Sequence, residues 1–129
     1  MDARITPTSL CTDLPFTSEA PSIARAQLLR FAPNLRAATV DDAVLMVSEL
    51  VTNAVVHGQP EISVRFWLCP ERLTVAVADG GEAPLRCATA AAGHASGRGL
   101  VIVDALATRW GVGRSESRAN NEVWFEMAT

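Results

Sequence analysis

The segment from about residue 39 or 41 to Gly58 constrains the fold most, because its apolar residues recur at the spacing of one helix face. At a turn of about 100° per residue, one broad stripe collects Val40, Ala43, Val44, Val47, Leu50, Val51, Ala54 and Val55. A stripe this wide has to pack on other structure, and we expect it to cover a sheet. Gly58 would end the helix in the left-handed conformation that suits glycine.

The opposite face of this helix carries polar groups at intervals of four residues, Glu49, Asn53 and His57, which makes them neighbours in space. The same face also holds the apolar residues Leu45, Met46 and Val56. A solvated face seldom contains so much hydrocarbon, which favours a site. The simpler interpretation is a surface Glu and Asn, with a histidine near the negative helix end. Other segments have to decide between the two.

The remaining segments predict an α+β fold. We expect an edge strand at residues 9–16, a serine-capped helix at 18–32, antiparallel strands at 61–69 and 72–79, a helix at 99–107, and strands at 108–112 and 121–127. Residues 80–98 are rich in Gly, Ala and Ser and suggest a functional lid. This order predicts a two-layer sandwich in which helices cover one face of a mixed, mostly antiparallel sheet, in one domain spanning 1–129.

Composition excludes several classes of function. A net charge of −3 lacks the basic excess of a nucleic-acid binder. The sequence contains neither an apolar run of membrane-spanning length nor a signal peptide, so we expect a cytoplasmic protein. It also contains no lysine, which excludes a Walker P-loop and Schiff-base chemistry. Cys11, Cys69 and Cys87 are widely spaced, which indicates free, partly buried thiols.

Two further motifs accompany the polar helix. In "VADGGEAP", Asp79 ends an apolar strand and glycines follow, so its carboxylate could accept a hydrogen bond from a nucleobase amine while Gly81 lets the base approach. In "SGRGL", residues 96–100, glycines open a helix whose free N–H groups can face phosphate. A plain turn and an ordinary helix start are the alternatives, and neither motif decides by itself.

Together and in this order, the three segments resemble the signature of the GHKL ATPase superfamily, which includes gyrase-type topoisomerases, heat-shock chaperones and histidine kinase catalytic domains. Nearly the whole chain, through "SELVTNAVVHG" to the closing "VWFEM", is most similar to the stand-alone anti-sigma factor serine kinases of bacteria. The resemblance implies ATP and Mg²⁺ as cofactors. It also implies a sigma factor and an anti-sigma factor antagonist as partners, and suggests a homodimer.

The resemblance assigns roles to individual residues. Asn53 would coordinate the magnesium that bridges the ATP phosphates, and Glu49 would orient or deprotonate the attacking hydroxyl or water. Asp79 would hold the adenine amino group, with Gly81 against the base. The lid over the phosphates and the start of its helix would be formed by Gly97, Arg98, Gly99 and Leu100. His57 receives no catalytic role.

Two positions depart from the family pattern. The second glycine of D-x-G-x-G is Ala83 here, which would stiffen the turn or tighten the base pocket. Many relatives carry Ser or Thr just before the apolar pair of the last strand, where this chain has Glu122, so a hydroxyl contact to the base region would be lost.

The leading hypothesis is therefore an ATP-dependent protein serine kinase that binds a sigma factor and phosphorylates the antagonist. The first alternative, which Ala83 and Glu122 favour, is an ATP-binding regulator that sequesters a partner without transferring phosphate. A detached histidine kinase catalytic domain and an α+β domain that binds no nucleotide are the remaining alternatives.

Overall fold

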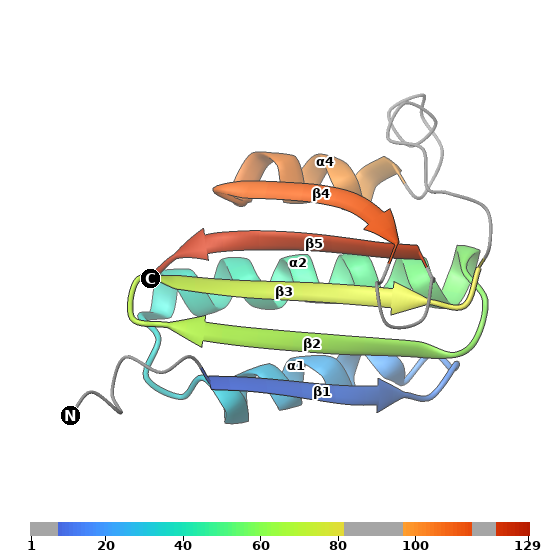
Figure 1. Cartoon of the computed structure of the whole chain (residues 1–129), viewed down its shortest axis with the longest axis horizontal. Coiled ribbons are helices and arrows are strands. Elements are labelled where there is room, and N and C mark those ends of the chain that lie inside the picture. Colours follow the sequence, from blue (N-terminus) through green and yellow to red (C-terminus); the bar gives the residue numbers. More distant parts are fainter. Residues whose placement is uncertain (1–7, 82–96, 115–120) are drawn as a thin grey trace.

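The computed structural model describes residues 8–81, 97–114 and 121–129. In chain order they form β1 (Thr8–Leu14), α1 (Ala20–Phe31), α2 (Ala37–His57), β2 (Ile62–Cys69), β3 (Arg72–Asp79), α4 (Gly97–Leu106), β4 (Arg109–Arg114) and β5 (Asn121–Ala128). The strands form one sheet in the order β1-β2-β3-β5-β4, and each neighbouring pair is antiparallel. Figure 1 shows the helices α1, α2 and α4 behind the sheet. The predicted two-layer α+β sandwich is confirmed, with every described strand pairing antiparallel.

The core lies between the helices and the inward face of the sheet. Alternate residues of the central strands are buried there: Ile62, Val64 and Phe66 from β2, Leu73, Val75 and Val77 from β3, and Val123, Phe125 and Met127 from β5. The period of two in the sequence sets this inward face. The ring of Phe66 stacks on that of Phe31 at 5.5 Å between centroids, which joins α1 to the sheet. No helix in the described part of the chain is long and apolar enough to cross a membrane.

Two predictions about helix ends are wrong. Ser18 does not cap α1, because the capping position is Glu19 and no side chain caps the helix there. Gly58 does not adopt a left-handed conformation after α2, since its φ is −93° and its ψ is −162°, which is extended backbone. A side chain would tolerate that backbone, so the need for glycine at this position has another cause, which lies at the candidate site.

The long helix α2 begins at Ala37, two residues before the earlier of the two predicted starts, 39 and 41, and ends at His57. Its buried stripe contains Met46, which is fully buried in the core. The prediction that Met46 shares the polar face of the helix is therefore wrong. Leu45 and Val56 do lie on the outer surface, with relative exposures of 42% and 64%.

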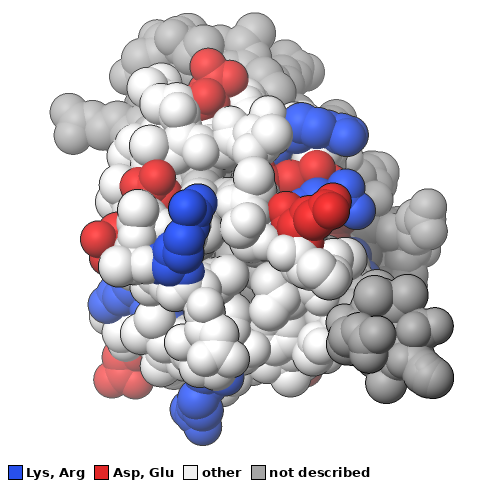
Figure 2. Space-filling view, turned by 90° about the vertical axis from the view of Figure 1, so that its left-hand side faces the viewer, with Lys and Arg blue, Asp and Glu red and all other residues white. Residues whose placement is uncertain are grey.

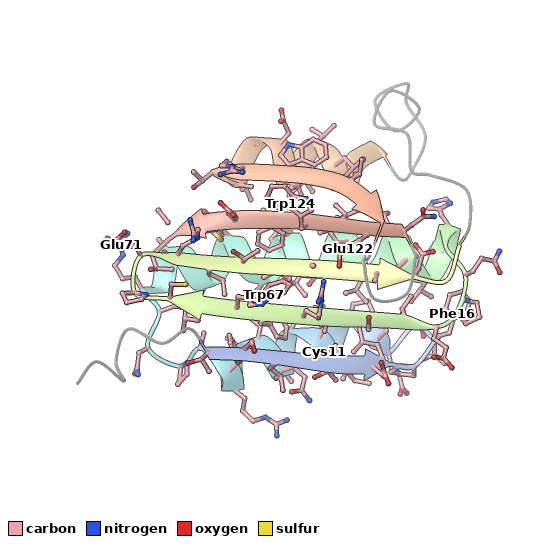
Figure 3. All side chains as sticks on the ribbon, in the orientation of Figure 1. Cys11, Phe16, Trp67, Glu71, Glu122 and Trp124 are labelled. Carbon is pink, nitrogen blue, oxygen red and sulfur yellow. The ribbon has the colours of Figure 1, made fainter. Side chains whose placement is uncertain are left out.

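The sheet face turned away from the helices carries large polar and aromatic side chains (Figure 3). Here the guanidinium of Arg65 donates to Glu122 at 2.9 Å and lies over the ring of Trp67 at 4.7 Å. The indole of Trp124 lies over Gly111, because a Cβ at position 111 would meet the ring at 2.9 Å. Of the predicted free thiols, Cys11 is exposed on this face and Cys69 is half-buried, whereas Cys87 lies outside the described residues.

Candidate functional site

Glu49 and Asn53 lie on one flank of α2, at the border between its buried stripe and its exposed outer surface. Both are half-buried. The opposite flank faces α1, because Arg25 of α1 donates to the hydroxyl of Ser48 at 3.0 Å. With about 100° per residue, Glu49 and Asn53 turn away from that contact. The two side chains are neither in the core nor fully solvated, unlike the outermost residues of the helix.

The elements that carry the three motifs run toward the same end of the molecule. Helix α4 packs against α2 as α1 does. In Figure 1, α1 and α4 lie on opposite sides of α2, and the right-hand end of the molecule contains the end of α2, the end of β3 and the start of α4. The flank with Glu49 and Asn53 therefore lies on the side of α2 that α4 occupies. Segments separated by dozens of residues in the sequence thus come together.

Asp79 ends β3 on the inward face of the sheet and is only 7% exposed. One carboxylate oxygen, Oδ1, accepts a hydrogen bond from the backbone N–H of Gly81 at 2.7 Å. This contact closes the turn after the strand and fixes the carboxylate. A carboxylate has further lone pairs, so Asp79 keeps acceptor capacity for a ligand amine in a site largely shielded from water.

Two glycines, Gly58 and Gly81, lie against this carboxylate, and Gly80 between Asp79 and Gly81 lies against the backbone of Pro60. A Cβ at Gly58 would lie 2.8 Å from Cγ of Asp79 and 2.6 Å from the carbonyl oxygen of Ala54. At Gly80 it would collide with the carbonyl oxygen of Pro60, and at Gly81 it would lie 2.8 Å from Oδ1 of Asp79. Glycine at these positions lets the end of α2, the end of β3 and the following turn approach one another. The role of Gly58 was missed because only the packing reveals it.

Asn121 is a second residue that sequence reasoning missed. It is the register partner of Asp79 at the start of β5 and is 5% exposed. Its amide nitrogen lies 3.1 Å from the Cβ position of residue 81, on the same side as Oδ1 of Asp79. The signal was an asparagine at the first inward position of a strand whose later inward residues are apolar. Because the register was unknown, this signal could not be linked to Asp79.

Glu122 lies on the other face of the sheet, where it binds Arg65 (Figure 3). Alternation along β5 turns residues 121 and 122 to opposite faces. The residue of β5 beside Asp79 is therefore Asn121, and Glu122 lies away from the predicted nucleobase site. The loss of a hydroxyl contact predicted from Glu122 rested on the wrong face of the strand.

Gly97, Arg98, Gly99 and Leu100 form the first turn of α4. The first backbone N–H groups of any helix lack partners within that helix and carry the positive end of its dipole. This backbone fits the predicted contact with phosphate, and that contact stays a prediction. The predicted lid falls mainly on residues 82–96, which lie outside the described residues, as does Ala83.

The residues at this end fit Mg²⁺ held together with ATP. Within the residues that the structure describes, no three His, Cys, Asp or Glu side chains gather closely enough to hold a metal ion by themselves. Magnesium that binds ATP oxygens and water needs only one or two protein ligands, and it prefers oxygen. The amide of Asn53 supplies an oxygen of this kind, and the carboxylate of Glu49 lies one helical turn away on the same flank of α2.

The hollows at the opposite end of the sheet do not match this chemistry. One, of about 500 Å³, lies beside the β2–β3 turn and is lined by residues that include Glu71, Arg72, Arg109 and Glu126. Another, of about 430 Å³, lies by the loop between α1 and α2. Figure 2 shows that acidic and basic side chains are intermixed on this end. Neither hollow contains any of the predicted site residues.

Comparison with known proteins decides the family. The model of the histidine kinase-like ATPase domain matches residues 14–127. The chain belongs to this family. The match includes every predicted site residue, and membership in the ATPase family implies ATP as the ligand.

A solved structure shares the fold of this histidine kinase-like ATPase domain. The crystal structure of the RsbU and RsbW domains of Rv1364c from Mycobacterium tuberculosis is similar with a TM-score of 0.69 and 22% sequence identity. The similarity covers 93% of this chain and 31% of that one, so this chain spans about a third of the length of that chain. The comparison with curated protein sequences gave no match.

Proposed function

We propose that this chain is an ATP-dependent protein serine kinase that binds a sigma factor and phosphorylates an anti-sigma factor antagonist. The observation that carries the proposal is that three motif-bearing elements run toward one end of the fold: α2 with the Glu49–Asn53 flank, β3 with the buried carboxylate of Asp79, and the first turn of α4. Membership in the ATPase family and the shared fold with a structure that contains an RsbW domain support the same proposal.

The chain's own residues bind and orient the nucleotide. Asp79 accepts a hydrogen bond from the adenine amino group, and Gly81 leaves room for the base. Asn53 holds Mg²⁺ through its amide oxygen, and the ion supplies neutralisation of the phosphate charge. The backbone N–H groups at Gly97, Gly99 and Leu100 face the phosphates. With no lysine in the sequence, these dipoles and Arg98 provide the protein's positive potential there.

Glu49 acts as the base for phosphoryl transfer. The serine hydroxyl oxygen of the antagonist attacks the γ-phosphorus, and the bond from that phosphorus to the oxygen bridging to the β-phosphate breaks. ADP leaves with the electron pair of that bond, and the hydroxyl proton goes to the carboxylate of Glu49. Phosphoryl transfer depends mainly on positioning and electrostatics. A base one helical turn from the metal ligand meets that need.

The partners follow from the resemblance to anti-sigma factor serine kinases. A sigma factor and its antagonist are the protein partners of that group, and we propose the same for this chain, acting as a homodimer in the cytoplasm. For the alternative of a non-catalytic regulator, the support drawn from Glu122 passes to Asn121, which lies beside Asp79 and offers an amide in place of a hydroxyl, whereas Glu122 lies on the other sheet face.

The test uses ATP labelled at the γ-phosphate, Mg²⁺ and candidate antagonist proteins, scored for labelled serine. Glu49→Gln should lower transfer by at least about 100-fold, the typical contribution of a general base, while ATP affinity stays close to that of the wild type. Glu71→Gln is the matched control, because Glu71 is exposed at the opposite end of the sheet (Figure 3) and should transfer normally. Transfer by Glu49→Gln at the wild-type rate would show that Glu49 is not the base. ATP binding without phosphoserine on any antagonist would favour the non-catalytic regulator.

A further inference from the structure

The start of β5 places a buried amide next to the carboxylate proposed to hold the nucleobase. Among the described residues, the buried polar side chains are Thr39, Ser63, Asp79 and Asn121. Asp79 and Asn121 are register partners, and they form the last pair of the β3–β5 ladder. Two of the four buried polar side chains in the described part of the chain thus lie at the predicted base site.

The amide stands at a position where the strand pattern favours an apolar residue. The later inward positions of β5 are Val123, Phe125 and Met127, and all three are buried in the core. A buried amide is costly unless its groups are hydrogen-bonded. Asparagine carries two amide hydrogens and an acceptor oxygen, so it can keep a partner within the protein and still donate to a ligand.

The backbone at Gly81 lies beside the side chains of both Asn121 and Asp79. The Cβ position of residue 81 lies 3.1 Å from Nδ2 of Asn121 and 2.8 Å from Oδ1 of Asp79. The ends of both side chains are therefore next to the surface on which the base is proposed to rest. A base against Gly81 would have an anionic acceptor and an amide donor at the same edge.

These two groups complement the edge of adenine, which presents an amino donor beside the acceptor N1. Ionised Asp79 only accepts, so it matches the amino group and leaves N1 without a donor. We propose that Asn121 supplies this donor: its Nδ2 hydrogen bonds to N1 of the purine and so determines the preference for adenine. The inference rests on the proposed function, because it needs ATP bound against Gly81.

The test varies the ligand and the protein together. Affinities for ATP and for 1-deaza-ATP, which has C–H in place of N1, are measured by calorimetry for the wild type and for Asn121→Leu. Loss of one hydrogen bond to a buried donor predicts that the wild type binds 1-deaza-ATP about tenfold more weakly than ATP. Asn121→Leu, which removes the donor at similar volume, should bind both ligands with about equal affinity. Glu122→Gln, next in sequence but on the other sheet face, should keep the wild-type ratio.

The outcomes distinguish a failure of the inference from a failure of the proposed function. Equal binding of both ligands by the wild type overturns the role of Asn121 and leaves ATP binding intact. The inference is also overturned if Asn121→Leu lowers the affinities for ATP and 1-deaza-ATP by the same factor, because the amide would then only support Asp79. A wild type that binds no ATP overturns the proposed function and the inference with it. Circular dichroism checks that Asn121→Leu folds, and Asn121→Ala, which removes the same donor, must give the same ratio.

Discussion

Substitution of Gly58 by alanine tests how the end of α2 positions the candidate base-binding carboxylate. The added Cβ would lie 2.6 Å from the carbonyl oxygen of Ala54, 2.8 Å from Cγ of Asp79 and 2.9 Å from its Oδ2. Two of these atoms belong to a carboxyl group that is buried and hydrogen-bonded to Gly81. The third is backbone of the last turn of α2. Relief of the contact therefore requires movement of the helix end, of Asp79 or of both.

The expected loss of stability follows from two opposing contributions. Adding a methyl group where there is no room costs about 1–3 kcal/mol. Gly→Ala also restricts the unfolded chain, which stabilises the fold by about 0.4–1 kcal/mol. The backbone of Gly58 is extended, so no strain from a left-handed conformation adds to the cost. We expect the free energy of unfolding to fall by about 1–2 kcal/mol in sum.

The effect on ATP affinity should exceed what the stability change alone would cause. A displaced Asp79 loses its hydrogen bond to the adenine amino group, and a hydrogen bond to a charged group contributes about 1.5–3 kcal/mol. We therefore expect the dissociation constant for ATP to rise at least about tenfold. Calorimetric titration measures this change at a temperature at which the variant is folded.

Gly113→Ala is the matched control for Gly58→Ala. A Cβ at Gly113 meets no atom within 4 Å, so alanine fits there without movement. Both variants are compared with the wild type by urea unfolding followed through tryptophan fluorescence. The control should be at least as stable as the wild type and bind ATP equally well. If Gly58→Ala unfolds at the same urea concentration as the control and binds ATP as tightly as the wild type, the proposed positioning of Asp79 by the helix end is wrong.

Two further predictions concern residues outside the site, one on the outer face of the sheet and one in the core. Glu122→Gln removes the ion pair with Arg65, whose side chain is 35% exposed. The free energy of unfolding, measured with urea, should therefore fall by at most about 1 kcal/mol, and ATP affinity, measured by titration, should not change. A large loss of ATP affinity would contradict the assignment of Glu122 to the other face. Phe66→Ala removes a fully buried ring that stacks on Phe31, so the free energy of unfolding should fall by about 3–5 kcal/mol. Phe16 is 39% exposed, so Phe16→Ala should lower the free energy of unfolding far less. Similar losses in the two variants would contradict this description of the core.

Local patterns in the sequence determined the elements and the kinds of chemistry. The apolar stripe of α2 and the alternation in β2 and β3 depend on the geometry of a single helix or strand, so they could be predicted without a partner. The same holds for an aspartate that ends a buried strand before glycines. The family signature depends on the order of such local pieces, which is why it was recognisable from the sequence.

The tertiary structure alone decided which side chains meet. Asn121 lies beside Asp79 because of the register between β3 and β5, and a shift by one residue would have put Glu122 there instead. Gly58 is required because the end of α2 packs against Asp79, from a strand about twenty residues further along the chain. Its backbone is extended, so local turn chemistry gave the wrong reason for this glycine. Register and interlayer packing depend on contacts between distant segments, and no window of the sequence contains both partners.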